Sequence, residues 1–278
     1  MTTRKRALSG GWYPVSANEC LREIRAFLSG FSAPEGHWTG GIAPHAGWTF
    51  SGRAAARVIS AIAESLQPDR VVIYGGHLSE GSDPIIYTEE SWETPMGPLT
   101  LDTQTSKDLV REGLAVAAPR NYSDNTVEVQ LPLVKHFFPD SSVIAVHSPS
   151  SDGSIQLGSA LEALLRSKGL TAAYLGSADL THYGPNYGFT SHGTGVPAVK
   201  WVKDDNDRSL IDHALAMDAV GLLRDSRLRH NTCSAGPIAS VIAAQSLRGV
   251  KHGLLVDYYT SYDVMPSSSF VGYAGIVY

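Results

Sequence analysis

Short apolar runs recur along the whole chain, each bounded by glycine, proline or small polar residues. Within these runs the apolar positions are nearly continuous rather than alternating, a pattern typical of strands that are covered on both faces. The runs expected to form strands are 40–44, 70–76, 142–147, 171–177, 252–261 and 270–278.

Between the runs, apolar residues recur at the spacing of amphipathic helices. Ser51 is expected to cap one helix, Gly169 suits the end of another, and Pro237 suits a first turn. This alternation predicts an α/β fold with a central mixed or mostly parallel sheet and helices on both faces. Since no linker divides the chain, we predict a single domain, 1–278. The expected helices are 21–31, 51–66, 155–169, 209–227 and 237–247.

Composition narrows the class of protein. The 278 residues are 43% hydrophobic and 18% charged, which is ordinary for a globular protein. The net charge is −5 and the one basic run, at 4–6, is short, so no nucleic-acid partner is expected. No apolar run approaches the roughly 20 residues that span a bilayer. The basic start lacks the apolar core of a signal peptide. We therefore expect no membrane partner and a cytoplasmic location.

Four of the ten histidines lie just past apolar runs, namely His45, His77, His147 and His182. In open α/β sheets, ligands bind beyond the carboxyl ends of strands. Glycine and proline beside His45 and His77 allow close approach of the backbone to a ligand. Imidazole is the commonest metal ligand and a good acid or base near neutral pH. We therefore favour functional roles for His45 and His77 and a structural role for His147.

The segment "SADLTHYG" places Asp179 and His182 three residues apart. At that spacing a carboxylate and an imidazole can face the same way, either as an acid/base pair or with the carboxylate orienting the histidine. Alternatively, Asp179 caps the following turn. Capping does not explain His182, for which we favour a functional role.

Two cysteines occur, too few for a disulfide framework. Cys233 precedes the helix predicted at 237–247, and the positive end of a helix lowers a thiol pKa. A thiolate is both a nucleophile and a metal ligand, whereas a buried cysteine in a tight turn is the structural alternative. Cys20, in a helical stretch, is interpreted as packing. Asn125 and Glu128 are interpreted as part of a helix start.

Several motifs together resemble those of the Memo family, which is similar in fold to the class III extradiol ring-cleaving dioxygenases. The resemblance implies one α/β domain with His45, His77 and Cys233 as metal ligands in a cleft. It also implies that Asp179 and His182 are the neighbouring catalytic pair. The motifs, in chain order from residue 10 to residue 275, are "GGWYP", "IAPHAGWTFSG", "VVIYGGH", "NTVEVQLP", "SADLTHYG", "NTCSAGP" and "SSSFVGYAG".

Two imidazoles and a thiolate suit iron, copper or zinc rather than magnesium or calcium. We expect a divalent or redox metal ion, with iron first and copper or zinc as alternatives. The expected substrate is a small molecule of the aromatic-diol kind, with His182 moving protons and Asp179 holding His182. Aromatic walls are expected from Trp48, Tyr183 and Tyr187. The segment 183–197 is either a lid or an ordinary surface loop, and a homo-oligomer is left open.

Three functions compete on the sequence. The first is a metal-dependent, dioxygenase-like oxidoreductase. The second is a metal-binding or ligand-binding module without catalysis. The third is a cysteine hydrolase with Cys233 as nucleophile, His182 as base and Asp179 as the residue that orients it.

Overall fold

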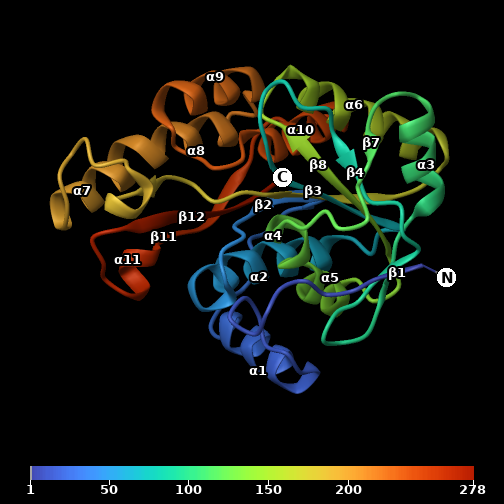
Figure 1. Ribbon diagram of the computed structural model, residues 1–278, viewed down its shortest axis with the longest axis horizontal. Coiled ribbons are helices and arrows are strands. Elements are labelled where there is room, and N and C mark those ends of the chain that lie inside the picture. Colours follow the sequence, from blue (N-terminus) through green and yellow to red (C-terminus); the bar gives the residue numbers. More distant parts are fainter. Residues whose placement is uncertain (1) are drawn as a thin grey trace.

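The fold is organised by a nine-stranded mixed sheet, seen in a computed structural model that describes residues 2–278 (Figure 1). The strand order is β10-β12-β2-β9-β3-β8-β4-β7, and β11 pairs with β12. The strands are β2 (Gly40–Ala43), β3 (Arg70–Leu78), β4 (Ile85–Ile86), β7 (Val116–Ala117), β8 (Ser142–Pro149), β9 (Ala172–Ser177), β10 (His182–Tyr183), β11 (Leu254–Thr260) and β12 (Phe270–Val277).

The centre of this sheet is parallel and its flanks are antiparallel. Strands β2, β9, β3 and β8 run parallel, whereas β12 and β4 run antiparallel to their central neighbours. A parallel strand covered on both faces needs apolar side chains in both directions. Val71, Val72, Ile73 and Tyr74 of β3 accordingly are all fully buried. The predicted mixed sheet is confirmed.

Helices cover both faces of the sheet, as predicted (Figure 1). Successive residues of β2 show the two layers: a side chain at Gly40 would meet Gln245 of α10, and one at Gly41 would meet Val58 of α2. The helices are α1 (Ala17–Phe27), α2 (Trp48–Ser65), α3 (Thr103–Arg111), α4 (Asn125–Glu128), α5 (Leu131–Phe137), α6 (Asp152–Ser167), α7 (Val196–Trp201), α8 (Asp207–Leu215), α9 (Ala219–Arg229), α10 (Ala235–Leu247), α11 (Ser261–Val264), a 3₁₀ turn η1 (Pro185–Tyr187) and a π-helical segment η2 (Val202–Asn206).

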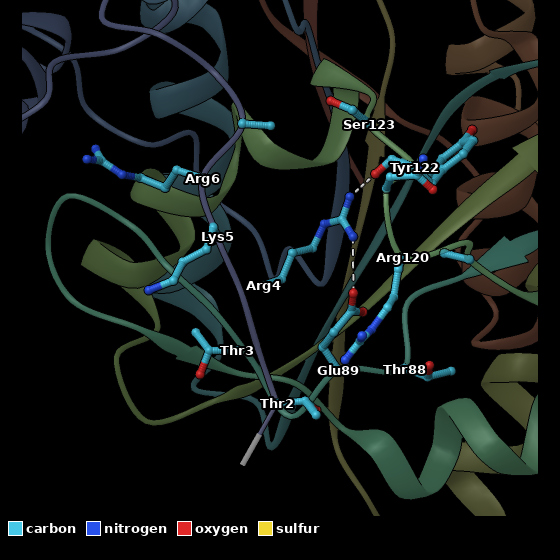
Figure 2. Close-up of a pocket in the computed structure, with 13 residues that line it drawn as sticks. Thr2, Thr3, Arg4, Lys5, Arg6, Thr88, Glu89, Arg120, Tyr122 and Ser123 are labelled. Carbon is cyan, nitrogen blue, oxygen red and sulfur yellow. Dashed lines mark hydrogen bonds and ion pairs between the residues drawn. The ribbon is translucent and has the colours of Figure 1, made fainter.

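The N-terminal segment contributes one strand to a small second sheet and then runs beside the loop that follows β7. Strands β1 (Thr3–Arg4), β5 (Ser91–Trp92) and β6 (Leu99–Thr100) make this three-stranded sheet. The segment then passes beside the loop 118–123 (Figure 2). The Glu128 carboxylate accepts hydrogen bonds from the Leu8 backbone N–H at 2.8 Å and the Tyr13 hydroxyl at 2.8 Å. These bonds fasten the N-terminal segment to α4.

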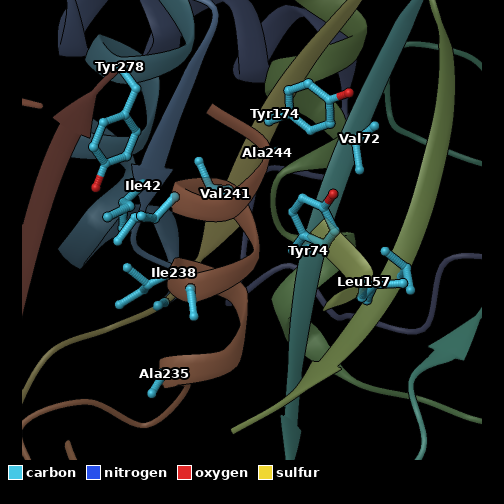
Figure 3. Packing of buried hydrophobic residues seen from close by; sticks show 14 of the residues in the cluster. Ile42, Val72, Tyr74, Leu157, Tyr174, Ala235, Ile238, Val241, Ala244 and Tyr278 are labelled. Carbon is cyan, nitrogen blue, oxygen red and sulfur yellow. The ribbon is translucent and has the colours of Figure 1, made fainter. Parts of the chain in front are cut away.

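Each face of the sheet has its own apolar core. Side chains alternate between the faces of a strand, so Val72 and Tyr74 of β3 pack with Ile238 and Val241 of α10 (Figure 3). Val71 of β3 belongs instead to the core under α2. Burying each such side chain stabilises the fold by roughly 1.5–3 kcal/mol. The two cores hold the ends of the central strands in fixed positions.

The helix predicted at 209–227 is wrong, because the structure divides it into α8 and α9. Met217 has a left-handed backbone with φ of 60°. Asp218 then caps α9, its carboxylate accepting a hydrogen bond from the Gly221 N–H at 2.8 Å. The break lies at Ala216–Met217–Asp218, which contains neither glycine nor proline, so Asp218, a common N-cap residue, is the one local sign of it.

The predicted cap at Ser51 is also wrong. Helix α2 begins at Trp48, with Gly47 as its N-cap, so Ser51 lies within the first turn. The Ser51 hydroxyl donates to the Ala46 carbonyl at 3.0 Å. Helix α10 begins at Ala235, two residues before Pro237, so Pro237 lies in its first turn as predicted. Among residues 2–278, no helix is both long and apolar enough to cross a membrane.

Candidate metal centre

Three adjacent parallel strands deliver polar side chains to one edge of the sheet. His45 follows β2, Asp179 follows β9, and His77 is the next-to-last residue of β3. Since β9 lies between β2 and β3, their carboxyl ends meet at this edge. Cys233, just before α10, joins them, and one ligand atom from each of His45, His77 and Cys233 lies within 4.8 Å of the others.

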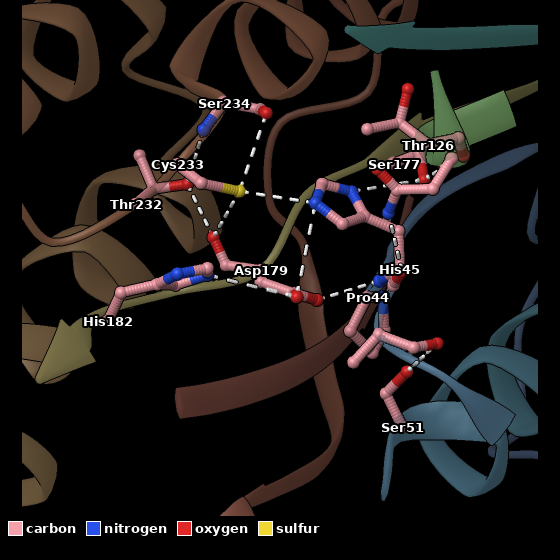
Figure 4. A network of polar contacts seen from close by, with 12 residues as sticks. Pro44, His45, Ser51, Thr126, Ser177, Asp179, His182, Thr232, Cys233 and Ser234 are labelled. Atoms are coloured by element: carbon pink, nitrogen blue, oxygen red, sulfur yellow. Dashed lines mark hydrogen bonds and ion pairs between the residues drawn. The ribbon is translucent and has the colours of Figure 1, made fainter. Parts of the chain in front are cut away.

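The His45 side chain is buried and held on several sides. Its backbone N–H donates to Asp179 Oδ1 at 2.7 Å, and its carbonyl accepts from the Asn125 amide at 3.1 Å. On the ring, Nδ1 lies 3.4 Å from the Ser177 hydroxyl, and Nε2 lies 3.2 Å from Cys233 Sγ. His45, Asp179, Cys233 and His182 are turned toward one another (Figure 4). The loop of small residues around His45 thus presents one ring nitrogen to the sulfur.

His77 is oriented by a carboxylate that the sequence did not single out. Its Nδ1 lies 3.0 Å from Asp124 Oδ2, and the other Asp124 oxygen accepts from the Thr126 N–H at 2.8 Å. The His77 ring stands nearly perpendicular to that of His45, with 5.1 Å between centroids. A carboxylate on the far nitrogen is the usual way in which proteins fix a ligating histidine.

Cys233 is attached to the same strand end through its backbone. Thr232 forms an isolated bridge with Leu180, and the Cys233 N–H donates to the Asp179 carbonyl at 3.3 Å. Burial alone would raise the pKa of the Cys233 thiol. The imidazoles of His45, His182 and His77 outweigh burial and lower that pKa well below its usual range. These imidazoles therefore favour the thiolate form of Cys233, the form that binds metals and attacks electrophiles.

The two candidate ligand histidines are correspondingly basic. Burial opposes protonation of His45, but the Asp179 carboxylate and the Cys233 sulfur raise its pKa to about 9. The hydrogen bond to Asp124, followed by contact with Cys233, raises the pKa of His77 to about 10. Negative groups therefore surround the point where the rings meet. A metal ion bound there would replace the ring protons.

The donor set and its spacing fit a single metal ion. Metal–sulfur bonds near 2.3 Å and metal–nitrogen bonds near 2.0 Å in tetrahedral geometry place the nitrogen and sulfur about 3.5 Å apart. The 3.2 Å between His45 Nε2 and Cys233 Sγ is close to that separation. Two imidazoles and a thiolate favour iron, copper or zinc over magnesium or calcium.

Asp179 and His182 lie next to this group without bonding each other. His182 Nε2 is 3.9 Å from Asp179 Oδ2, too far for a hydrogen bond. That nitrogen is buried and has no hydrogen-bond partner among residues 2–278. Burial raises the pKa of Asp179, and contact with Cys233 and the charge of Asp179 raise that of His182 despite burial. Asp179 thus holds the His45 backbone rather than the His182 ring.

A cavity of about 510 Å³ opens onto His45, His77, Asp179 and His182. The expectation for its aromatic walls is wrong in part: Tyr187 lines the cavity, but Trp48 and Tyr183 lie in packed cores. Sequence reasoning missed the other lining side chains, which come from segments far apart in the chain. They include Trp12, Phe50, Ser261, Met265, Ser267, Ser269, Val271 and Tyr273.

The remaining predicted residues take structural positions. His147 is fully buried, its ring nitrogens contact the hydroxyls of two tyrosines, and it is not part of the group formed by His45, His77 and Cys233. Cys20 is buried on α1, where burial raises its pKa to about 11. Asn125 begins α4, as the helix-start interpretation expects, yet its amide also holds His45. The segment 183–197 reaches the cavity through Tyr187, and its role as a lid stays a prediction.

Comparison with known proteins shows what the chain is similar to. The profile of a family described as "Memo-like protein" matches residues 4–277. MEMO1 family proteins of Methanopyrus kandleri and Pyrococcus horikoshii are 31% and 30% identical, each over 99% of this chain and 98% of the relative. A MEMO1 family protein of Methanosarcina acetivorans is 28% identical, and the match covers 100% of this chain and 99% of that relative.

A solved structure extends the comparison to the fold. The crystal structure of an uncharacterized protein from Escherichia coli superposes with a TM-score of 0.52 at 12% sequence identity. The match covers 86% of this chain and 98% of that chain. At that identity the likeness concerns the fold alone.

Proposed function

Because the chain belongs to the Memo family, we propose that it binds one metal ion through His45, His77 and Cys233 and acts as a dioxygenase-like oxidoreductase. The observation that carries this proposal is the convergence of the three ligand atoms within 4.8 Å of one another. Residues that lie 32 and 156 positions apart in sequence meet at one edge of the sheet. The convergence is accompanied by a carboxylate on His77 and a thiolate form of Cys233.

The ligands set the choice of metal. We favour iron because two histidines and one anionic ligand resemble the iron site of the ring-cleaving enzymes. Copper and zinc are the alternatives, because a thiolate is a softer donor than the carboxylate of those enzymes. When bound, any of these metals would supply a Lewis-acidic centre, and iron or copper a redox-active one, with coordination positions left open by only three protein ligands. The open cavity beside His45 and His77 gives a small molecule access to those positions.

The chain's own residues orient the ligands and handle protons. Asp124 fixes the His77 ring, and Asp179 and Asn125 fix the His45 backbone. His182 lines the same cavity, and its Nε2, although 3.9 Å from Asp179 Oδ2, has no hydrogen-bond partner within residues 2–278. This nitrogen is therefore free to exchange a proton with a molecule in the cavity, as a general acid or base must be.

The shape of the cavity supports an aromatic, hydroxylated substrate. Trp12, Phe50, Tyr187 and Tyr273 supply flat apolar surface, which suits a planar ring. Ser261, Ser267 and Ser269 also line the cavity, and their hydroxyls are hydrogen-bonding groups for a polar substituent. Small-molecule sites commonly combine such apolar walls with a few placed polar groups.

Elemental analysis of tag-free protein purified without chelator tests the metal proposal. We expect one iron, copper or zinc ion per chain in the wild type and loss of that ion in His77→Ala. His252→Ala, which removes an exposed histidine outside the site, is the matched control and should retain the ion. The proposal would be contradicted by a wild type that is purified without metal and whose absorption spectrum does not change when iron, copper or zinc is added.

Cys233 also supports a second candidate function, a cysteine hydrolase. The observation in its favour is the lowered thiol pKa beside His182 and Asp179. A nucleophilic role predicts fast alkylation of Cys233 at neutral pH and a covalent adduct with an ester substrate. If bound metal blocks alkylation and no adduct forms in the metal-free protein, the hydrolase is excluded.

A binding module without catalysis differs from both. It predicts that the double variant His45→Ala, His77→Ala abolishes metal binding but leaves the biological role intact. Loss of the role in the double variant, with folding preserved, supports the oxidoreductase instead.

A further inference from the structure

A second and larger cavity lies between the N-terminal segment and the loop before α4. It measures about 870 Å³ and is bounded by residues 2–7 on one side and 118–123 on the other, with Thr88 and Glu89 between them (Figure 2). No described residue lines both this cavity and the one at the candidate metal centre. It is thus a separate site on the same molecule.

Positive charge is concentrated around this cavity. The basic run Arg4–Lys5–Arg6 lines it from one side and Arg120 from the other. Among its described lining residues, Glu89 is the one carboxylate. The chain as a whole carries a net charge of −5, so four cations beside one acid are a strong local excess. A recess of one sign attracts small ions of the opposite sign.

Arg4 is fixed in place before any ligand arrives. Its side chain is 8% exposed, and its guanidinium carbon lies 4.5 Å from the ring centre of Tyr87 and 4.7 Å from that of Trp92. One terminal nitrogen donates to Glu89 at 3.1 Å and the other to the Tyr122 carbonyl. A guanidinium has five N–H donors. Arg4 therefore holds a rigid orientation and keeps donors to spare.

Arg120 supplies a second guanidinium on the same side of the N-terminal segment. Figure 2 shows its side chain extending toward Glu89, whose carboxylate lies between Arg120 and the Arg4 guanidinium, whereas Lys5 and Arg6 extend on the other side of that segment. Lys5 is paired with Glu93. Arg120 has neither an ion pair nor a side-chain hydrogen bond to any residue within 2–278, so its donors are available to a ligand.

We propose that this cavity binds a small, multiply charged anion through Arg4 and Arg120. A guanidinium presents two parallel N–H groups that match the oxygens of a phosphate or carboxylate. Hydroxyls of Thr88 and Ser123 and the amide of Asn121 provide further hydrogen-bonding groups. Tyr122 is the one aromatic residue among the described lining residues, and its ring packs on His147. The ligand is therefore recognised by its charge rather than by a stacked base.

The proposal is independent of the metal centre, although the two sites share a segment. The Tyr122 carbonyl that Arg4 binds lies two residues before Asp124, the partner of His77. Binding of the anion needs no metal, so a test on metal-free protein separates failure of this proposal from failure of the proposed function.

Isothermal titration of the full chain with inorganic phosphate, pyrophosphate and citrate, at low and at physiological salt, tests the anion site. We expect saturable binding of at least one probe, weakened by salt because the contacts are charged. Arg120→Gln should weaken binding at least tenfold, with unchanged circular dichroism. Arg224→Gln, an exposed arginine on α9 outside the cavity, should bind as the wild type does. The affinity of Arg120→Lys should lie between those of the wild type and Arg120→Gln. Lysine keeps the positive charge but lacks the two parallel N–H donors of a guanidinium.

The three probes also identify the class of anion. Tighter binding of pyrophosphate or phosphate than of citrate indicates a phosphate-bearing ligand, and the reverse order indicates a polycarboxylate. The proposal would be overturned if the wild type shows no saturable binding of any probe at concentrations up to about 10 mM. That concentration is high enough to detect dissociation constants of about 1 mM and somewhat weaker. Equal affinity of Arg120→Gln and Arg224→Gln would overturn it as well.

Discussion

His77 and His147 lie at the ends of neighbouring parallel strands, yet their surroundings are opposite. In the register of β3 and β8, Gly75 pairs with His147, so the two histidines are close along the same edge. His77 has the Asp124 carboxylate on Nδ1, which raises its pKa to about 10. His147 has the Tyr122 hydroxyl at 3.0 Å from Nδ1 and the Tyr87 hydroxyl at 3.2 Å from Nε2, and burial lowers its pKa to about 4.

The comparison shows that position at a strand end does not by itself make a histidine a ligand. A ligating ring needs one free nitrogen that faces the other donors and a partner on the far nitrogen that orients it. His77 meets both conditions, whereas both nitrogens of His147 are occupied by tyrosines. Gly76 permits this arrangement: its φ is 96°, and a side chain there would approach the His147 ring to 2.7 Å.

Removing one proposed ligand should have the largest effect. We expect Cys233→Ser and His77→Ala each to lower metal affinity by more than the roughly 100-fold typical of losing an orienting partner. His147→Phe should keep one metal ion per chain. Chelator competition followed by elemental analysis measures the difference. If His147→Phe loses metal as completely as His77→Ala, the two histidines are not functionally distinct.

The pH dependence of stability should reveal the buried, neutral state of His147. An unfolded chain titrates histidine near pH 6.5, whereas burial lowers the folded-state pKa of His147 to about 4. The unfolded state therefore binds more protons between these values, and the free energy of unfolding rises with pH. This stabilisation is complete above about pH 6.5 and is lost as the pH falls through about 4, a change of about 3 kcal/mol.

Urea unfolding of metal-free wild type and His147→Phe across this pH range isolates that contribution. The stability difference between the two proteins should shrink as the pH falls, because the variant has no imidazole to protonate. Parallel curves for the two proteins would show that His147 is not the group responsible.

Asp124→Asn should have an intermediate effect that is confined to the metal centre. Asparagine also caps helices, so α4 should persist, but the charge that orients His77 is lost. We expect metal affinity to fall by about 10- to 100-fold, the usual cost of losing such a partner. Titration against a competing chelator measures it. An unchanged affinity would mean that Asp124 only caps the helix.

Tyr122→Phe should have the smallest effect. It removes the hydroxyl bonded to His147 Nδ1, a change worth about 1 kcal/mol of stability. Metal affinity should stay the same, because His147 belongs to the structural side of the comparison. Urea unfolding and chelator competition on one preparation check both statements, and a loss of metal affinity without a loss of stability would reverse the assignment.

The sequence predicted much of the fold and some of the side chains that meet at the sheet edge, but not the residue that orients His77. Continuous apolar runs identify the central strands because both faces of a parallel sheet are buried. His45 and His77 could be found because glycine and proline accompany them at strand ends. Asp124 could not be found in this way, because an aspartate just before a helix is expected only to cap it. In the structure Asp124 both caps α4 and orients His77.

The cavity and one helix break depend on tertiary structure. Trp12 and Phe50 reach the cavity together because the N-terminal segment folds beside the start of α2, where the Trp48 N–H donates to the Trp12 carbonyl at 2.8 Å. The Trp48 side chain instead turns into a core. The break before α9 is stabilised by the Asp218 cap and a left-handed Met217, neither of which a helical pattern reveals.

Anomalous diffraction at the iron, copper and zinc edges, on crystals grown without added metal, tests the central claim most directly. The account predicts one peak within about 2.0–2.3 Å of His45, His77 and Cys233, the range of metal–nitrogen and metal–sulfur bonds. No peak among these side chains, or a peak elsewhere that leaves the sulfur unengaged, would contradict it.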